Sequence, residues 1–212
     1  MKKDARYTAA QALLRMESAG AYSNLTIDSL IEKNGLDARE GAFAAALFYT
    51  VLERRLTIDH VLAAYCARGL ASLSKPVLQT LRPGVCQLVW MDGVDDYAAV
   101  SDSVHLTRAL GRAKASGFVN GVLRAFLRAD KAVLPVKGGT AERLRVAYSC
   151  PVWPVEAWLP AYGEAAPLRV LRASLGRPPP YLRANTLRAS APPPCDRLAA
   201  DGRAAVPPDP PA

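Results

Sequence analysis

The sequence predicts a mainly α-helical protein, with a helical bundle over residues 1–130 followed by the start of a small α+β subdomain over residues 140–206. Along the bundle, apolar side chains recur at intervals of three and four, and no strand-like alternation appears. Short polar or glycine-containing segments separate these stretches, which is the pattern of an all-α bundle. We expect residues 131–139 to be a linker and residues 207–212 to form a disordered, proline-rich end.

Start and stop signals divide the bundle into about seven helices. Asp4 and Asp37 are placed to cap two of them, and Gly35 can end another in the left-handed conformation. The expected helices run over 4–19, from Ser23 or Asn24 to Asn34, over 38–55, from Thr57 or Asp59 through Tyr65, from Lys75 to Met91, over 97–110 and over 117–129.

Two of these helices carry a specific structural expectation. Apolar positions cover much of the circumference of the 38–55 helix, so we expect it to be central in the bundle. Pro83 lies inside the helix that begins at Lys75. Because a proline there removes one backbone hydrogen bond, we expect a kink or a break at this position.

Beyond the linker, the long amphipathic stretches give way to shorter, proline-rich segments. Residues 181–188 alternate loosely and are the one convincing strand candidate. The segments supply too few strands to close a second domain. Helices are expected over 140–148, 155–162, 164–174 and 195–202, with a proline-bracketed tryptophan turn at 149–154.

The composition argues against membrane and secreted classes. Half of the residues are hydrophobic, yet no run of about 18 apolar residues exists, so we expect no membrane span. Polar residues interrupt the segment after the N-terminal lysines, so we expect no signal peptide and a cytoplasmic protein. The four cysteines are far apart and form no C-x-x-C pair, which favours free thiols over disulfides or a zinc site.

The net charge of +8 is concentrated in one region of the chain. Residues 1–100 hold 11 basic and 11 acidic residues, whereas residues 101–145 hold nine basic and three acidic ones. Such a basic excess suggests a polyanionic partner, although a solvated arginine-rich surface gives the same composition.

The residues themselves indicate no catalytic, cofactor or metal site. There is no glycine-rich phosphate loop and no nucleophile elbow. His60 and His105 are isolated, and Cys195 lies in a proline run without a neighbouring base to lower its pKa.

An ordered set of motifs gives the chain a family resemblance. The motifs are Ala5-Arg6-x-x-Ala9-x-Gln11, Leu81-Arg82-Pro83-Gly84-Val85-Cys86-Gln87-Leu88, Gly117-Phe118-Val119-Asn120-Gly121-Val122-Leu123-Arg124, Tyr148-Ser149-Cys150-Pro151-x-Trp153 and Leu182-Arg183-Ala184-Asn185-Thr186-Leu187-Arg188. They resemble the NusB-like N-terminal region of bacterial ribosomal RNA cytosine-C5 methyltransferases of the RsmB (Sun/Fmu) type. Stand-alone NusB lacks the last two motifs, so the resemblance implies the methyltransferase branch.

The resemblance implies a monomeric protein that positions 16S ribosomal RNA of the small subunit for methylation. In the family, S-adenosylmethionine binds a Rossmann-like domain that follows and carries two catalytic cysteines, one of which attacks the base as a thiolate. No position of this chain matches those cysteine motifs. The resemblance therefore implies a truncated chain that lacks the catalytic domain and its cofactor and is inactive alone.

The resemblance and the basic excess together indicate an RNA-binding surface. For Arg124 and its neighbour Asn120, a second hypothesis stays open, in which they tie helices together within the bundle. Asp95 and Asp96 add negative charge beside the expected RNA face. The candidate phosphate contacts are Lys2, Lys3, Arg6, Arg112, Lys114, Arg124 and Arg128, and the candidate contacts to unpaired loops or bases are Arg183 and Asn185.

Two other classes of function remain as alternatives. The first is a transcription antitermination factor of NusB type, an RNA-binding module without the later motifs. The second is a helical protein-interaction domain with no RNA role, which would bind RNA no better than any basic protein and would release it at moderate salt.

Overall fold

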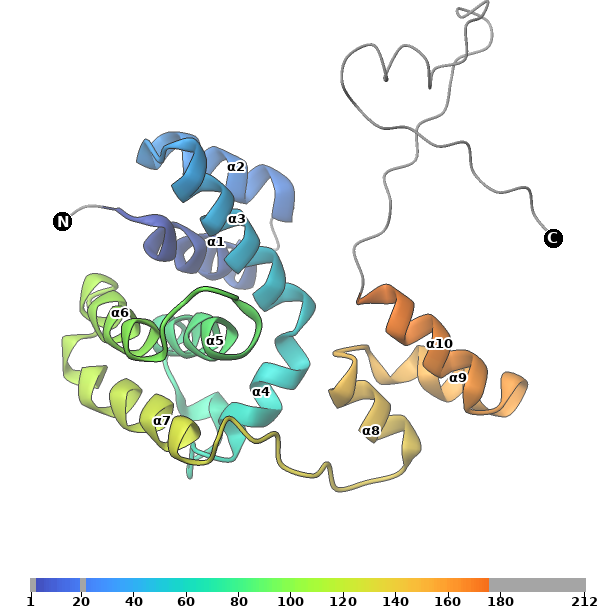
Figure 1. The fold of residues 1–212 in the computed structure, drawn as a ribbon. Helices are drawn as coiled ribbons and strands as arrows, with labels where there is room; N and C mark the ends of the chain where they lie inside the picture. The colour runs from blue at the N-terminus through green and yellow to red at the C-terminus, as the bar shows by residue number, and fades with distance from the viewer. Residues whose placement is uncertain (1–2, 20–21, 176–212) are drawn as a thin grey trace, which may run out of the picture. The chain divides into compact units, whose positions relative to one another are not determined.

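The computed structural model describes residues 3–19 and 22–175, and every regular element within them is helical. Figure 1 shows their arrangement. The elements are α1 (Ala5–Ala19), α2 (Ser23–Asn34), α3 (Ala38–Glu53), α4 (Arg55–Ala63), η1 (Leu70–Ser72), α5 (Lys75–Trp90), α6 (Asp96–Ala109), η2 (Ala113–Ala115), α7 (Ser116–Arg128), α8 (Thr140–Ala147), α9 (Val152–Tyr162) and α10 (Ala165–Ser174).

The prediction of an all-α bundle in the first part of the chain is confirmed, with small differences at helix ends. Asp4 and Asp37 each accept a hydrogen bond from a first-turn amide at 2.8 Å, as expected of N-caps. Gly35 ends α2 at φ 64°. The predicted cap of α2 is wrong, because Tyr22 occupies the cap position and its side chain makes no capping bond.

The central helix is α5, so the expectation that the 38–55 helix is central is wrong. Every residue from Val77 to Leu88 is buried, whereas α3 leaves side chains such as Tyr49 exposed. Figure 1 shows α5 in the middle of the bundle, in contact with α1, α3, α4, α6 and α7. The core around it includes Phe48, Leu81 and Phe126.

Because α5 is enclosed, its polar side chains need partners from neighbouring helices. Arg82, which is 6% exposed, donates from Nε and Nη2 to the two carboxylate oxygens of Asp59 on α4, each at 2.8 Å. Gln79 donates to Glu17 on α1 at 2.8 Å. Charged and amide groups therefore fix how α1 and α4 pack on the central helix.

Pro83 does not break α5, contrary to one of the two expected outcomes. The helix continues without interruption from Lys75 to Trp90. The side chain of Gln87 donates to the Pro83 carbonyl at 3.0 Å, within the buried part of the helix.

Gly84 allows two helices to approach α5 closely. A Cβ atom at this position would lie 2.9 Å from Leu123 Cδ1 on α7 and 2.9 Å from Ser103 Oγ on α6. Both distances are shorter than a carbon atom tolerates. The absence of a side chain at Gly84 therefore sets the spacing of the helices that carry the candidate site.

After α7, residues 131–139 contain no helix or strand, and α8 to α10 then form a separate small core. Leu144, Val155 and Leu171 are its buried members, one from each helix. The predicted strand at 181–188 and helix at 195–202 lie outside the described residues, so the α+β character and the proposed domain boundaries stay predictions.

Helices α4 and α8 complete each other's ends. The backbone amide of Leu56, in the first turn of α4, donates to Ser149 Oγ at 3.0 Å, just past the end of α8. In return, Thr57 donates through its hydroxyl to the carbonyl of Val146 in the last turn of α8. The contact supplies an acceptor to the Leu56 amide at the start of α4, and it gives the Val146 carbonyl a second donor beside the Ser149 amide, which lies 3.4 Å away. The Ser149 of the tryptophan-turn motif therefore has a structural role.

Gly84→Ala should destabilise the protein by about 1–3 kcal/mol, because the added methyl group overpacks the contact with Leu123 and Ser103. The measurement is urea unfolding of the full chain. Gly121→Ala is the matched control. Gly121 lies in α7 with no atom within 4 Å of an added Cβ, so alanine there should stabilise by about 0.5–1 kcal/mol. Equal effects of the two substitutions would contradict the close approach at Gly84.

Ser149→Ala should weaken the junction of α4 and α8 by about 1 kcal/mol, the usual value of an N-cap. Serine and alanine bear similar strain at φ 51°, so the hydroxyl is the difference being tested. Amide hydrogen exchange should accelerate at Leu56. Ser29→Ala, at an exposed position of α2, is the control, and unchanged exchange at Leu56 would show that the Ser149 hydroxyl does not cap α4.

Candidate nucleic-acid interface

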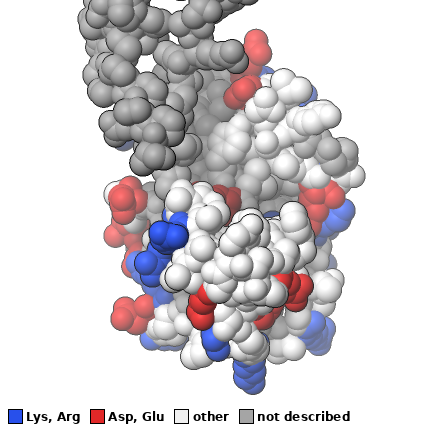
Figure 2. Space-filling model, turned by 90° about the vertical axis from the view of Figure 1, so that its right-hand side faces the viewer, with Lys and Arg blue, Asp and Glu red and all other residues white. Residues whose placement is uncertain are grey.

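The basic side chains do not form one continuous field on the face shown in Figure 2. There, Lys and Arg are interspersed with Asp and Glu around a largely uncharged centre. Whether a given cation can meet RNA therefore depends on its own exposure and on its partners within the protein. The predicted contacts accordingly divide into exposed cations without a partner and cations that are bound within the protein.

Arg112, Lys114 and Arg128 are available to a partner. Arg112 and Lys114 lie on the connection between α6 and α7, and Arg128 lies in the last turn of α7. All three are exposed, and within the described part of the chain none has an ion pair or side-chain hydrogen bond. Lys3 is likewise exposed ahead of α1, whereas Lys2, Arg183 and Asn185 lie outside the described residues.

Arg6 is held within the bundle. Its Nε donates to Gln87 Oε1 at 2.6 Å, and its Nη2 lies 3.2 Å from Asp102 Oδ2. The guanidinium also lies over the Phe43 ring, 5.0 Å from the centroid. These contacts join α1 to α3, α5 and α6, so Arg6 is first a packing residue, which its sequence motif did not indicate.

Arg124 and Asn120 pair within one helix. Arg124 Nε donates to Asn120 Oδ1 at 3.0 Å, one turn apart on α7. Among the described residues neither side chain hydrogen-bonds to another helix, so the structure does not support the hypothesis that they tie helices together. Arg124 is exposed, and its two terminal nitrogens remain free donors.

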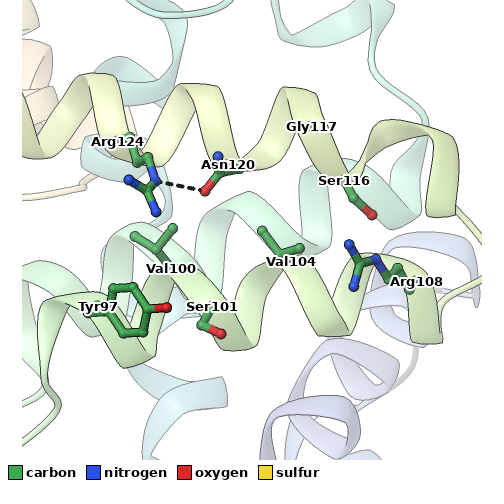
Figure 3. Close-up of a pocket in the computed structure, with 9 residues that line it drawn as sticks. All are labelled: Tyr97, Val100, Ser101, Val104, Arg108, Ser116, Gly117, Asn120 and Arg124. Atoms are coloured by element: carbon green, nitrogen blue, oxygen red, sulfur yellow. Dashed lines mark hydrogen bonds between the residues drawn. The ribbon is translucent and has the colours of Figure 1, made fainter.

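A groove runs between α6 and α7 and contains this pair. Its volume is about 250 Å³. Figure 3 shows Arg124 and Asn120 toward one end, beside Tyr97, and Arg108 with Ser116 at the other. The lining residues are Tyr97, Val100, Ser101, Val104, Arg108, Ser116, Gly117, Asn120 and Arg124.

Arg108 was not among the predicted contacts, although its spacing offered a signal. It lies four residues after Val104, which places the two on one face of α6. That face of α6 becomes one wall of a groove only because α7 packs beside it. Arg108 is exposed and has no ion-pair partner in the described residues.

The acidic pair at the start of α6 is partly neutralised. Asp95 accepts from the Ala98 amide at 3.0 Å as the N-cap of α6. Asp96 accepts from Lys131 Nζ at 2.7 Å. Both carboxylates therefore have local partners, and Asp96 has a cationic one.

The three cysteines among the described residues are not activated as nucleophiles. Cys66, Cys86 and Cys150 are free thiols, as predicted. Burial raises the pKa of Cys86 to about 12 and also raises the pKa of Cys66 and of Cys150, so the reactive thiolate is scarce at neutral pH.

No group of three or more His, Cys, Asp or Glu side chains lies together in the part of the chain that the structure describes. Nor is any helix in that part both long enough and apolar enough to span a bilayer.

Arg6→Ala should lower the free energy of unfolding by about 2 kcal/mol, because it removes an ion pair, a hydrogen bond to Gln87 and a cation–π contact. Replacing Arg112 and Lys114 together by alanine should change it by less than about 0.5 kcal/mol. Urea unfolding of the full chain measures both. A larger loss in the double variant would show that these two cations have structural partners after all.

The helical bundle is similar to known proteins. Residues 3–128 match the NusB family. A crystal structure of antitermination factors NusB and NusE in complex with dsRNA resembles the chain with a TM-score of 0.55 and 25% sequence identity. The match covers 59% of this chain and 94% of the other.

Longer relatives match beyond the bundle. The probable ribosomal RNA small subunit methyltransferase B of Bacillus subtilis (strain 168) is 31% identical over 202 residues, which is 95% of this chain and 45% of the relative. The ribosomal RNA small subunit methyltransferase B of Xylella fastidiosa (strain 9a5c) is 33% identical over 171 residues, or 81% of this chain and 38% of the relative. The chain therefore spans less than half the length of either relative.

Proposed function

We propose that this chain, which belongs to the NusB family, is the RNA-binding N-terminal portion of a bacterial 16S ribosomal RNA (cytosine-C5)-methyltransferase. In this role it acts in the cytoplasm, as a monomer, and positions small-subunit ribosomal RNA for methylation. The proposal concerns RNA binding, because the NusB family match lies in the bundle and the chain spans 45% of the Bacillus relative.

The main support for this proposal is that the similarity to the longer relatives extends beyond the NusB family match. The NusB family match ends at residue 128, whereas the similarity to the Bacillus relative extends over 202 residues. Similarity therefore continues through α8 to α10 and the tryptophan-turn motif, which a stand-alone NusB domain does not need. Ser149 of that motif caps α4, so the later helices are joined structurally to the bundle.

The exposed cations are suited to contacts with the RNA backbone. Lys3, Arg112, Lys114 and Arg128 have no competing carboxylate within the described chain. Contacts from such residues position RNA without reading its sequence. The proposed set of RNA contacts also includes Arg124 and, outside the described residues, Lys2, Arg183 and Asn185. Arg6 belongs to it as well, but it contributes mainly by holding α1 in place.

We assign the methyl transfer itself to a catalytic domain outside residues 1–212. S-adenosylmethionine would bind there and supply the methyl group, and a thiolate of that domain would attack the cytosine ring. In this proposal the chain alone is inactive and needs no cofactor.

A second candidate is a NusB-type transcription antitermination factor. The family match and the likeness to NusB in its complex with NusE and dsRNA favour it. The two candidates differ in their RNA target. Ultraviolet cross-linking of the full chain in its own cells, followed by sequencing of the bound RNA, separates them. Reads concentrated on mature 16S ribosomal RNA support the first candidate, and reads on leader transcripts support the second.

Replacing Lys2, Lys3, Arg112 and Lys114 by glutamate should weaken binding to 16S ribosomal RNA and flatten its salt dependence. The slope of log K against log[salt] should fall by about 0.7 to 0.9 for each phosphate that the variant no longer neutralises. Electrophoretic mobility shifts over a range of salt concentrations measure both quantities.

The matched control reverses four exposed cations elsewhere, at Arg15, Lys33, Arg39 and Arg169. It produces the same change of net charge without touching the proposed surface. If RNA affinity falls by the same factor in both variants, binding depends on overall charge alone. That result would support the alternative of a helical protein-interaction domain with no RNA role.

A further inference from the structure

We propose that the groove between α6 and α7 binds a short stretch of unpaired RNA, with a phosphate at its Arg108–Ser116 end and a base against Tyr97. The inference rests on the proposed function, because it takes RNA as the ligand. It adds Tyr97, Arg108 and Ser116, none of which was among the predicted RNA contacts. Figure 3 shows these residues facing the same groove from two helices.

The phosphate end is defined by an unsatisfied hydroxyl. Ser116 is 6% exposed, and its Oγ has no hydrogen-bond partner among the described residues. Figure 3 shows this oxygen directed toward the side of the groove where Arg108 lies. A buried hydroxyl without a partner is unfavourable, and a ligand oxygen that accepts a hydrogen bond from it would remove the penalty.

Two sources of positive charge meet at the same end. Ser116 is the first residue of α7, a helix of 13 residues whose N-terminus carries a partial positive charge. Arg108 supplies a guanidinium with no ion-pair partner in the described chain. A guanidinium binds the oxygens of a phosphate group in two parallel hydrogen bonds. A phosphate suits the unsatisfied hydroxyl, the helix N-terminus and the guanidinium together.

The opposite end is suited to a base. Tyr97 is 73% exposed and makes no ring contact in the part of the chain that is described. Exposed aromatic rings stack on unpaired bases of any identity. Across the groove, Arg124 and the Asn120 amide offer hydrogen-bond donors beside the ring position. An unpaired base can stack on such an aromatic face while its edge accepts hydrogen bonds from the neighbouring donors.

The dimensions and charge of the groove favour a nucleic-acid strand. Ser116 and Arg124 are eight residues apart on α7, which at 1.5 Å per residue is about 12 Å. This length exceeds the 3.4 Å rise of one stacked base step, so a phosphate at one end and a base at the other can belong to the same strand. Among the described residues that line the groove there is no Asp or Glu, and Val100 and Val104 supply its apolar surface.

The test measures how the full chain binds a fluorescein-labelled single-stranded RNA oligonucleotide and the same strand in a duplex. Arg108→Gln should reduce the slope of log K against log[salt] by about 0.7, the value for one phosphate contact to a single strand. Tyr97→Leu should weaken single-strand binding roughly tenfold with an unchanged slope, and should leave duplex binding unaffected.

Ser116→Ala should shift stability and binding in opposite directions. The substitution removes an unsatisfied buried hydroxyl, so the melting temperature should stay the same or rise. Binding of the single strand should weaken, because the phosphate loses a donor. A merely structural role for Ser116 predicts a lower melting temperature with unchanged affinity, and that result would remove the serine from the site.

Arg15→Gln is the control, since Arg15 is an exposed cation of α1 that does not line the groove. If Arg108→Gln and Tyr97→Leu bind the single strand as Arg15→Gln does, the groove proposal is overturned while the proposed function stands. If the unmodified chain binds neither RNA, both fall. If the groove variants instead lose only the binding of a protein, the groove is a protein-docking site and the proposal is wrong.

Discussion

The buried ion pair of Arg82 and Asp59 is the interaction on which the bundle depends. A guanidinium enclosed in a protein interior is tolerated only when its donors are satisfied, and both carboxylate oxygens of Asp59 lie 2.8 Å from it. A second carboxylate, that of Glu17 on α1, lies 3.9 Å from the same guanidinium. Removing the carboxylate of Asp59 would leave the buried guanidinium without its main partner, which costs at most about 3 kcal/mol, because Asp59 is partly exposed and Glu17 remains nearby. The pair therefore sets how α4 and α1 meet the central helix.

The same side-chain chemistry serves two purposes in this protein. Arg82 and Arg6 are engaged by acceptors of the bundle, so their charges stabilise the fold. Arg108, Arg112 and Arg128 have no such acceptors within the described residues, so their charges face the surroundings. Composition alone does not separate the two groups. What separates them is whether another helix brings a carboxylate or amide within hydrogen-bonding distance, and this is why a count of basic residues overstates the surface available to RNA.

Local signals in the sequence predicted the helices of the bundle well, because periodicity and caps are read within a few residues. The central helix was misassigned because hydrophobic periodicity treats Gln79, Arg82 and Gln87 as surface residues. Their partners lie 62, 23 and 81 positions away in the chain, beyond the reach of any local pattern. The candidate site was predicted only in part for the same reason. Arg112 and Lys114 are exposed on a connection, as expected, whereas the groove of Arg108 exists only once α6 and α7 are packed together.

The exchange of caps between α4 and α8 couples two parts of the chain that the sequence separates by a proline- and glycine-containing linker. Since both hydrogen bonds join the first turn of α4 to the end of α8, the two ends stabilise each other when they are in contact. Any partner that holds α8 in position must therefore stabilise the first turn of α4, and by thermodynamic reciprocity a partner that orders α4 must favour the docked state of α8 to the same degree. Binding at either part of the molecule can in this way be sensed at the other without a change of fold.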